Sequence, residues 1–243
     1  MALTPTNNDS FYREVDEELR REQLQGFWKR YGLWLALAAV LLVLAVAGYA
    51  WWRAEQRKAA ERESETLVGV VTQLSENRPA GTQPQIDQLA KSPREGYRAA
   101  ALFTRAGVQL AEGKDAQAVA TYKQVAADEN LPDPYRNLAL IRHTVLEFDA
   151  IAPQLVVERL RPLAVRGNPW HGSAGELVGA ALLKQGKTKE AAPVFAAIAK
   201  DETVPETIRA RATQMAGSLG IDATEDRTAQ DGATRAAANK QGE

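Results

Sequence analysis

A stretch of 20 residues without a charged side chain, Leu33 to Trp52, constrains this sequence more than any other feature. An α-helix rises about 1.5 Å per residue, so a helix of this length spans about 30 Å, the thickness of a bilayer's hydrocarbon core. Aromatic residues gather at both ends, and amphipathic rings favour the headgroup region of a membrane. The sequence therefore predicts one transmembrane helix over residues 31–52, represented by Leu33, Trp34, Leu41, Leu44, Trp51 and Trp52.

The alternatives to a membrane span are a cleaved signal peptide and a buried helix of a soluble domain. A signal peptide has an apolar core of about 7–15 residues near the start of the chain. This stretch is longer and begins after residue 30. A buried helix of a soluble domain is rarely free of charge over such a length. We therefore expect a permanent anchor.

The charges that flank the span do not decide its orientation. Cationic residues are balanced, with Arg20, Arg21, Lys29 and Arg30 before it and Arg53, Arg57, Lys58 and Arg62 after it. An excess of Lys and Arg on one side marks the cytoplasmic side of a span. Since neither side has an excess, orientation must come from another argument.

Composition and motifs argue against several functional classes. Lys and Arg total 30 against 31 Asp and Glu, so the basic excess that nucleic-acid binding needs is missing. The absence of cysteine excludes disulfides, thiolate metal sites and a cysteine nucleophile. The two histidines, His143 and His171, belong to no HExxH motif, and the sequence has no phosphate-binding loop or nucleophile elbow. We expect no catalytic residue, no cofactor and no metal.

Two segments separated by 73 positions carry the same pattern. Residues 111–133 match residues 184–206, with the pairs Gly113/Gly186, Ala118/Ala191, Tyr122/Phe195 and Pro132/Pro205. The separation equals two helix-turn-helix units of about 34 residues plus a short insertion. A degenerate third unit is expected between them over residues 134–164, where Pro162 should kink or end the second helix. The sequence predicts an all-α fold, with a short solenoid of helix pairs following the span.

The matched residues resemble the tetratricopeptide signature. In that signature the glycine makes the turn between paired helices, the alanine permits close approach, the aromatic ring fills the gap between pairs, and the proline starts the next helix. The whole layout is similar to the ancillary SecYEG translocon subunit family. It has a charged tail over residues 1–30, the span over 31–52, a helical stalk and linker over 53–92, a tetratricopeptide-like domain over 93–220 and a disordered tail over 221–243.

The resemblance implies a function and a location. It implies a bacterial inner-membrane protein with a cytoplasmic N-terminus and a periplasmic repeat domain. Such a subunit is non-enzymatic and acts beside the translocon, with translocon subunits, periplasmic chaperones or exported proteins as partners. The alternative is a scaffold for outer-membrane or cell-wall assembly. The N-terminal tail carries a short amphipathic helix with Phe11, Val15, Leu19 and Leu24 on one side, which suits either a spacer or a partner-docking helix.

The resemblance also implies a protein-binding groove. In tetratricopeptide folds the first helix of each pair lines a concave surface, which here would include Phe103, Leu110, Leu138, Ile141, Val145 and Phe148. Apolar residues at helical spacing are more often core residues. The alternative is that this set is packed inside the domain or covered by the stalk.

Overall fold

The computed structural model describes residues 8–79 and 81–223, with side chains described from residue 28 except at position 80. Within these ranges the chain forms nine helices and no strand, so the predicted all-α class is confirmed. The chain divides into two compact units, residues 1–62 and 63–243. The side chains of the predicted amphipathic segment in the N-terminal tail lie outside the described residues, as do residues 224–243 of the predicted disordered tail.

Helix α1 (Asn8–Ser75) is 68 residues long. It contains no proline, which would remove a backbone donor and break the helix. It ends where Asn77 adopts a left-handed φ of 57°, just before Pro79. One part of α1 is long and apolar enough to cross a membrane, and none of its apolar window is buried. The six span residues named above are exposed, from 56% for Trp52 to 83% for Leu33, so the window is not a buried core helix.

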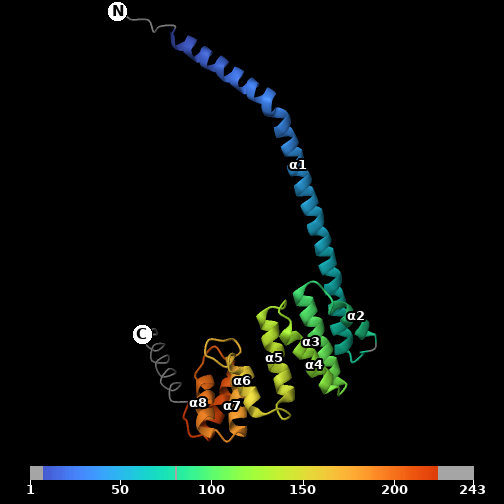
Figure 1. Ribbon diagram of the computed structural model, residues 1–243, viewed down its shortest axis with the longest axis vertical. Helices are drawn as coiled ribbons and strands as arrows, with labels where there is room; N and C mark the ends of the chain where they lie inside the picture. The colour runs from blue at the N-terminus through green and yellow to red at the C-terminus, as the bar shows by residue number, and fades with distance from the viewer. Residues whose placement is uncertain (1–7, 80, 224–243) are drawn as a thin grey trace, which may run out of the picture. The chain divides into compact units, whose positions relative to one another are not determined.

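The second unit consists of the last turns of α1 and eight further helices. These follow in chain order (Figure 1): α2 (Thr82–Leu89), α3 (Glu95–Ala111), α4 (Asp115–Ala127), α5 (Asp133–Glu147), α6 (Pro153–Leu160), α7 (His171–Lys184), α8 (Thr188–Ala199) and α9 (Glu206–Ser218). Consecutive helices from α2 to α9 are in contact. The arrangement is a row of packed helical hairpins.

The two glycines of the repeated pattern close the hairpins α3–α4 and α7–α8. Gly113 has φ 71° and Gly186 has φ 73°, a region that favours glycine. The amide of Lys114 donates to the carbonyl of Gln109 at 2.8 Å, and Lys187 donates to Leu182 at 2.9 Å. Both are bonds of the Schellman type, which satisfy the last carbonyls of a helix. The same turn therefore occurs twice, 73 positions apart.

The other members of the pattern lie in corresponding places. Ala118 and Ala191 are fully buried, and Tyr122 and Phe195 are 6% and 3% exposed. Pro132 and Pro205 immediately precede α5 and α9. Between the two well-formed hairpins, α6 has only 8 residues and ends at Leu160, two positions before Pro162. A proline lacks the backbone donor that would extend the helix.

The second unit contains two apolar clusters. The first surrounds Leu102 and Tyr122 on α3 and α4 and extends to Ala139. The second begins at Ile141 and continues through α6, α7, α8 and α9. Ile221 and Ala223, at the start of the predicted disordered tail, pack in this second cluster. Helix α5 therefore contributes to both clusters.

Candidate protein-interaction surface

The structure separates the six residues of the predicted groove. Phe103 and Leu110 pack against the first cluster, and the Phe103 and Tyr122 rings lie 5.5 Å apart. Ile141 and Phe148 belong to or pack against the second cluster, and Leu138 is half-buried. Val145 alone of the six is classed as exposed, with 48% of its surface accessible. The predicted groove on the first helices therefore remains a prediction, and most of the residues named for it pack in the two apolar clusters.

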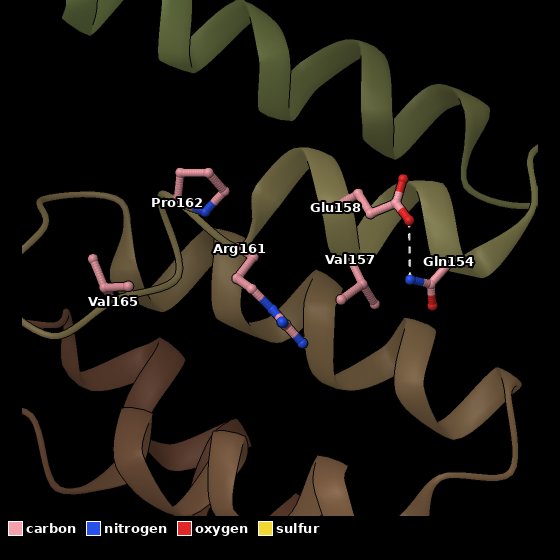
Figure 2. A pocket seen from close by; sticks show the side chains of 6 residues that line it. All are labelled: Gln154, Val157, Glu158, Arg161, Pro162 and Val165. Atoms are coloured by element: carbon pink, nitrogen blue, oxygen red, sulfur yellow. Dashed lines mark hydrogen bonds between the residues drawn. The ribbon is translucent and has the colours of Figure 1, made fainter.

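Other apolar side chains do reach the surface in the middle of the unit. Leu146 of α5 is 36% exposed, and Leu155 of α6 is 43% exposed. Along α6 a shallow pocket of about 410 Å³ is lined by Gln154, Val157, Glu158, Arg161, Pro162 and Val165. In Figure 2 the hydrogen-bonded Gln154 and Glu158 lie at one end, and Pro162 and Val165 lie at the other. The pocket offers an apolar wall beside one cation and one anion.

A second groove lies where α1 ends beside α3. Its volume is about 420 Å³, and its lining is mainly apolar or small: Leu74, Asn77, Pro79, Thr104, Gly107, Val108, Ala111 and Glu112. Val68 and Val71, earlier on α1, are 61% and 52% exposed. Apart from its chain neighbours and the backbone of α3 itself, no heavy atom lies within 4 Å of the position that a Cβ atom would take at Gly107. The groove is therefore open, and the lack of a side chain at Gly107 makes it deeper on the α3 side.

This groove exists because the end of α1 is part of the repeat unit. Val70 of α1 is fully buried. The Glu63 carboxylate accepts hydrogen bonds from Ser92 Oγ at 2.8 Å and from Arg94 Nη1 at 3.0 Å. The predicted domain started at residue 93, so sequence reasoning missed the groove. The spacing of Leu67, Val70 and Leu74 was the available signal, because it marks one apolar helix face.

A second ion pair explains an irregularity of the first repeat. Arg105 stands on α3 where the tetratricopeptide signature usually has an apolar residue. Its Nη2 lies 2.7 Å from Asp87 Oδ1 on α2, and its side chain is only 20% exposed. The charged residue thus ties α3 to the helix before it.

Glu147, near the C-terminus of α5, connects three helices. Its Oε1 accepts from Lys123 Nζ of α4 at 2.5 Å, and its Oε2 accepts from Arg159 Nη1 of α6 at 3.1 Å. The Oε2 atom also lies 3.0 Å from His143 Nδ1 on α5. Burial alone would raise the pKa of Glu147, but these hydrogen bonds outweigh it and lower that pKa to about 2. Burial is the main reason that the pKa of His143 is lowered, although the hydrogen bond to Glu147 acts in the opposite direction.

Replacing Glu147 with glutamine should destabilise the second unit by about 2 kcal/mol, because hydrogen bonds to charged groups are lost. A carboxyl with a depressed folded pKa stabilises the fold above its unfolded pKa of 4.5 and loses that contribution as pH falls toward about 2. The variant should therefore lose part of its acid sensitivity. Urea unfolding at pH 7 and pH 3.5, followed by circular dichroism, measures both effects. The matched control is Glu158→Gln, an exposed position on α6; equal losses in the two variants would contradict this role of Glu147.

The two histidines occupy structural positions. His143 belongs to the Glu147 network. His171, at the start of α7, places its Nδ1 2.6 Å from Asp201 Oδ2, and the two side chains are 4% and 3% exposed. Among the residues that the structure describes, no three His, Cys, Asp or Glu side chains are placed to hold a metal ion.

Comparison with known proteins places the chain. A family model described as a tetratricopeptide repeat-like domain matches residues 25–216. The chain belongs to this family. This tetratricopeptide repeat-like chain is also similar to the ancillary SecYEG translocon subunit of Escherichia coli (strain K12), with 27% identity over 187 residues that cover 76% of this chain and 87% of that protein. No solved structure gives a significant match.

These findings give the chain a protein-interaction role of a non-catalytic kind. The family match covers both the apolar segment of α1 and nearly all the helix pairs. The apolar helix fits a single-pass membrane protein, and the relative is named for a translocon. The open α1–α3 groove and the exposed side chains of α5 and α6 are apolar surfaces of the second unit that no other part of the described chain covers.

Proposed function

We propose that this protein is a membrane-anchored, non-enzymatic interaction subunit of the protein translocon that passes exported proteins to periplasmic chaperones. One observation carries the proposal: the similarity to the ancillary SecYEG translocon subunit extends over 76% of the chain. A helix that is fit to cross a membrane, followed by packed helix pairs, suits such a role. The anchor would raise the local concentration of the helix pairs near a membrane partner.

The proposed location is the bacterial inner membrane, with the N-terminus in the cytoplasm and the helix pairs in the periplasm. Long domains cross a membrane largely regardless of their charge, and residues 63–223 form the long domain here. A protease added outside the inner membrane should digest the chain beyond residue 53 and protect the first 30 residues. The opposite protection pattern would reject the periplasmic assignment.

The proposed surface for exported proteins is the α1–α3 groove together with the exposed part of α5. An apolar groove suits an extended or helical segment that offers apolar side chains. Val71, three positions before the groove residue Leu74, is 52% exposed, and Val145 is 48% exposed on α5. Both positions leave room for a photoreactive side chain without disturbing a cluster.

Cross-linking in living cells followed by capture tests the whole proposal. Photoreactive residues at positions 71 and 145 should yield adducts with translocon subunits, exported chains or periplasmic chaperones. Position 189 on α8, an exposed lysine, is the matched control and should yield few. Adducts with proteins of outer-membrane or cell-wall assembly would reject the translocon assignment and support the scaffold alternative.

A further inference from the structure

Three cationic side chains follow the apolar segment within six positions: Arg53, Arg57 and Lys58. All three are exposed. The salt bridges of the described residues include none of them, although several of their neighbours are paired. Exposed cations without a carboxylate partner, placed directly after a membrane span, form a charged surface that the protein itself does not neutralise.

The aromatic residues that precede these cations indicate how deep the cations lie relative to the bilayer. Trp51 and Trp52 are 73% and 56% exposed, and the Tyr49 and Trp52 rings lie 6.2 Å apart. Such rings favour the headgroup region. With a rise of about 1.5 Å per residue, Arg57 lies about 7.5 Å beyond Trp52 along the axis. The headgroup layer is about 5–7 Å deep on each side of the hydrocarbon core, and long cationic side chains bend toward it.

The ion pairs of the described residues join none of these cations to the nearest acidic residues. The Glu55 carboxylate accepts a hydrogen bond from Arg62 Nη2 at 3.5 Å. Arg53 and Arg57 lie one helical turn apart on the same face, whereas Glu55 lies two positions from each and so faces another direction. Glu61 lies one helical turn after Arg57 on the same face, but no ion pair joins the two side chains among the described residues. At the other end of the span, Arg30 lies 5.9 Å from the centre of the Tyr31 ring, so its guanidinium already has a partner.

We propose that Arg53, Arg57 and Lys58 form an interaction surface for anionic phospholipid headgroups. A guanidinium matches a phosphate with two parallel hydrogen bonds, and two of the three residues are arginines. The inference rests on the proposed membrane anchor. It does not depend on orientation, because the three residues meet a headgroup layer whichever leaflet they face. The surface would give the protein a preference among the lipids that surround its span.

Quenching of tryptophan by brominated lipids tests the proposal on the full-length chain. Trp28→Phe and Trp34→Phe leave Trp51 and Trp52 as the reporters at this end, and a chain that also lacks these two gives the background from Trp170. The protein is reconstituted in phosphatidylcholine vesicles that contain either brominated phosphatidylglycerol or brominated phosphatidylcholine at equal mole fraction. Each cation near an anionic surface contributes about a fivefold preference, so three cations acting together should favour the brominated anionic lipid by roughly a hundredfold.

Two charge-matched variants identify the residues responsible. Arg53→Gln with Arg57→Gln should reduce the preference to the roughly fivefold contribution of the remaining Lys58, and adding Lys58→Gln should bring the preference close to one. Lys29→Gln with Arg30→Gln removes the same charge at the other end and should leave the preference unchanged. Raising the salt concentration from about 0.1 M to 1 M shortens the screening length from about 10 Å to 3 Å and should weaken the preference. Inorganic phosphate at equal ionic strength should have no effect; competition by it would mean that the residues bind free phosphate instead.

Each remaining outcome has a distinct meaning. If neither brominated lipid quenches Trp51 and Trp52, the membrane anchor itself is wrong. Equal quenching by both lipids shows that the anchor is inserted but overturns the headgroup preference. A preference that is undiminished by the loss of Arg53 and Arg57, or that falls equally in the Lys29 and Arg30 variant, also overturns it.

Discussion

Replacing Phe195 with alanine should destabilise the second unit by about 3–5 kcal/mol, the range for removing a buried aromatic side chain. Phe195 is 3% exposed and belongs to the larger apolar cluster. Its ring lies against Gly179 of α7, so alanine would leave a cavity between α7 and α8. Urea unfolding followed by circular dichroism measures the change. Lys189→Ala, an exposed substitution on the same helix, should change stability by less than about 0.5 kcal/mol.

The contact between Phe195 and Gly179 gives a sharper form of this prediction. A side chain built at Gly179 comes within 2.6 Å of the Phe195 ring, so Gly179→Ala alone should cost about 1–3 kcal/mol through overpacking. In the Phe195→Ala background the clash is gone, and the same substitution should be neutral or stabilising, since alanine favours helix over glycine by about 1 kcal/mol. A double-mutant cycle measures this change of sign.

Gly107→Ala is the control for the helix preference. Gly107 lies inside α3, and a Cβ atom at this position would meet no heavy atom within 4 Å beyond its chain neighbours and the backbone of its own helix. Alanine there should stabilise the unit by roughly 0.5–1 kcal/mol. A cost at Gly179 that remained the same with and without the Phe195 ring would mean that the ring does not set the spacing of α7 and α8.

The features that sequence predicted well are local. A glycine with a positive φ closes the turns of the α3–α4 and α7–α8 hairpins, so Gly113 and Gly186 repeat at a fixed distance. The apolar window of α1 is equally visible, because charge-free length can be counted directly. In both cases a few neighbouring residues determine the structure, and the fold class follows from them.

The candidate surface was harder to predict because periodicity does not tell which apolar face is covered. Phe103 and Val145 both lie on first helices of pairs, yet Phe103 packs against Tyr122 and Val145 is 48% exposed. Whether such a face is buried depends on which helices pack against it, and the sequence alone does not show that packing. The partnership of Arg105 with Asp87 is similar: the charged residue looks anomalous until α2 is placed beside α3.

The pair of His171 and Asp201 shows the same limit, because 30 positions separate its members. His171 opens α7 and Asp201 follows α8, so their hydrogen bond joins the two ends of this hairpin. The second carboxylate oxygen of Asp201 accepts from the Thr203 amide at 3.1 Å and from its hydroxyl at 2.6 Å. The carboxylate therefore also shapes the turn that leads into α9.

Asp201→Ala should destabilise the second unit by about 1–3 kcal/mol, since it leaves the buried His171 ring without its hydrogen-bond partner. The Thr203 hydroxyl, more than the His171 ring, lowers the pKa of Asp201 below its usual 3.8. Its stabilising effect is therefore complete above pH 3.8 and is lost as pH falls further. Urea unfolding of the variant should show a flatter dependence on pH below 4 than that of the parent chain.

Two substitutions distinguish the contribution of the His171–Asp201 hydrogen bond from that of the Asp201–Thr203 turn. Asp201→Asn keeps an oxygen for Thr203 but loses the charge, so it should cost less than alanine and remove the acid dependence. Glu202→Ala changes the adjacent exposed residue and should change stability by less than about 0.5 kcal/mol. If Asp201→Ala costs no more than Glu202→Ala, the buried pair does not hold the hairpin.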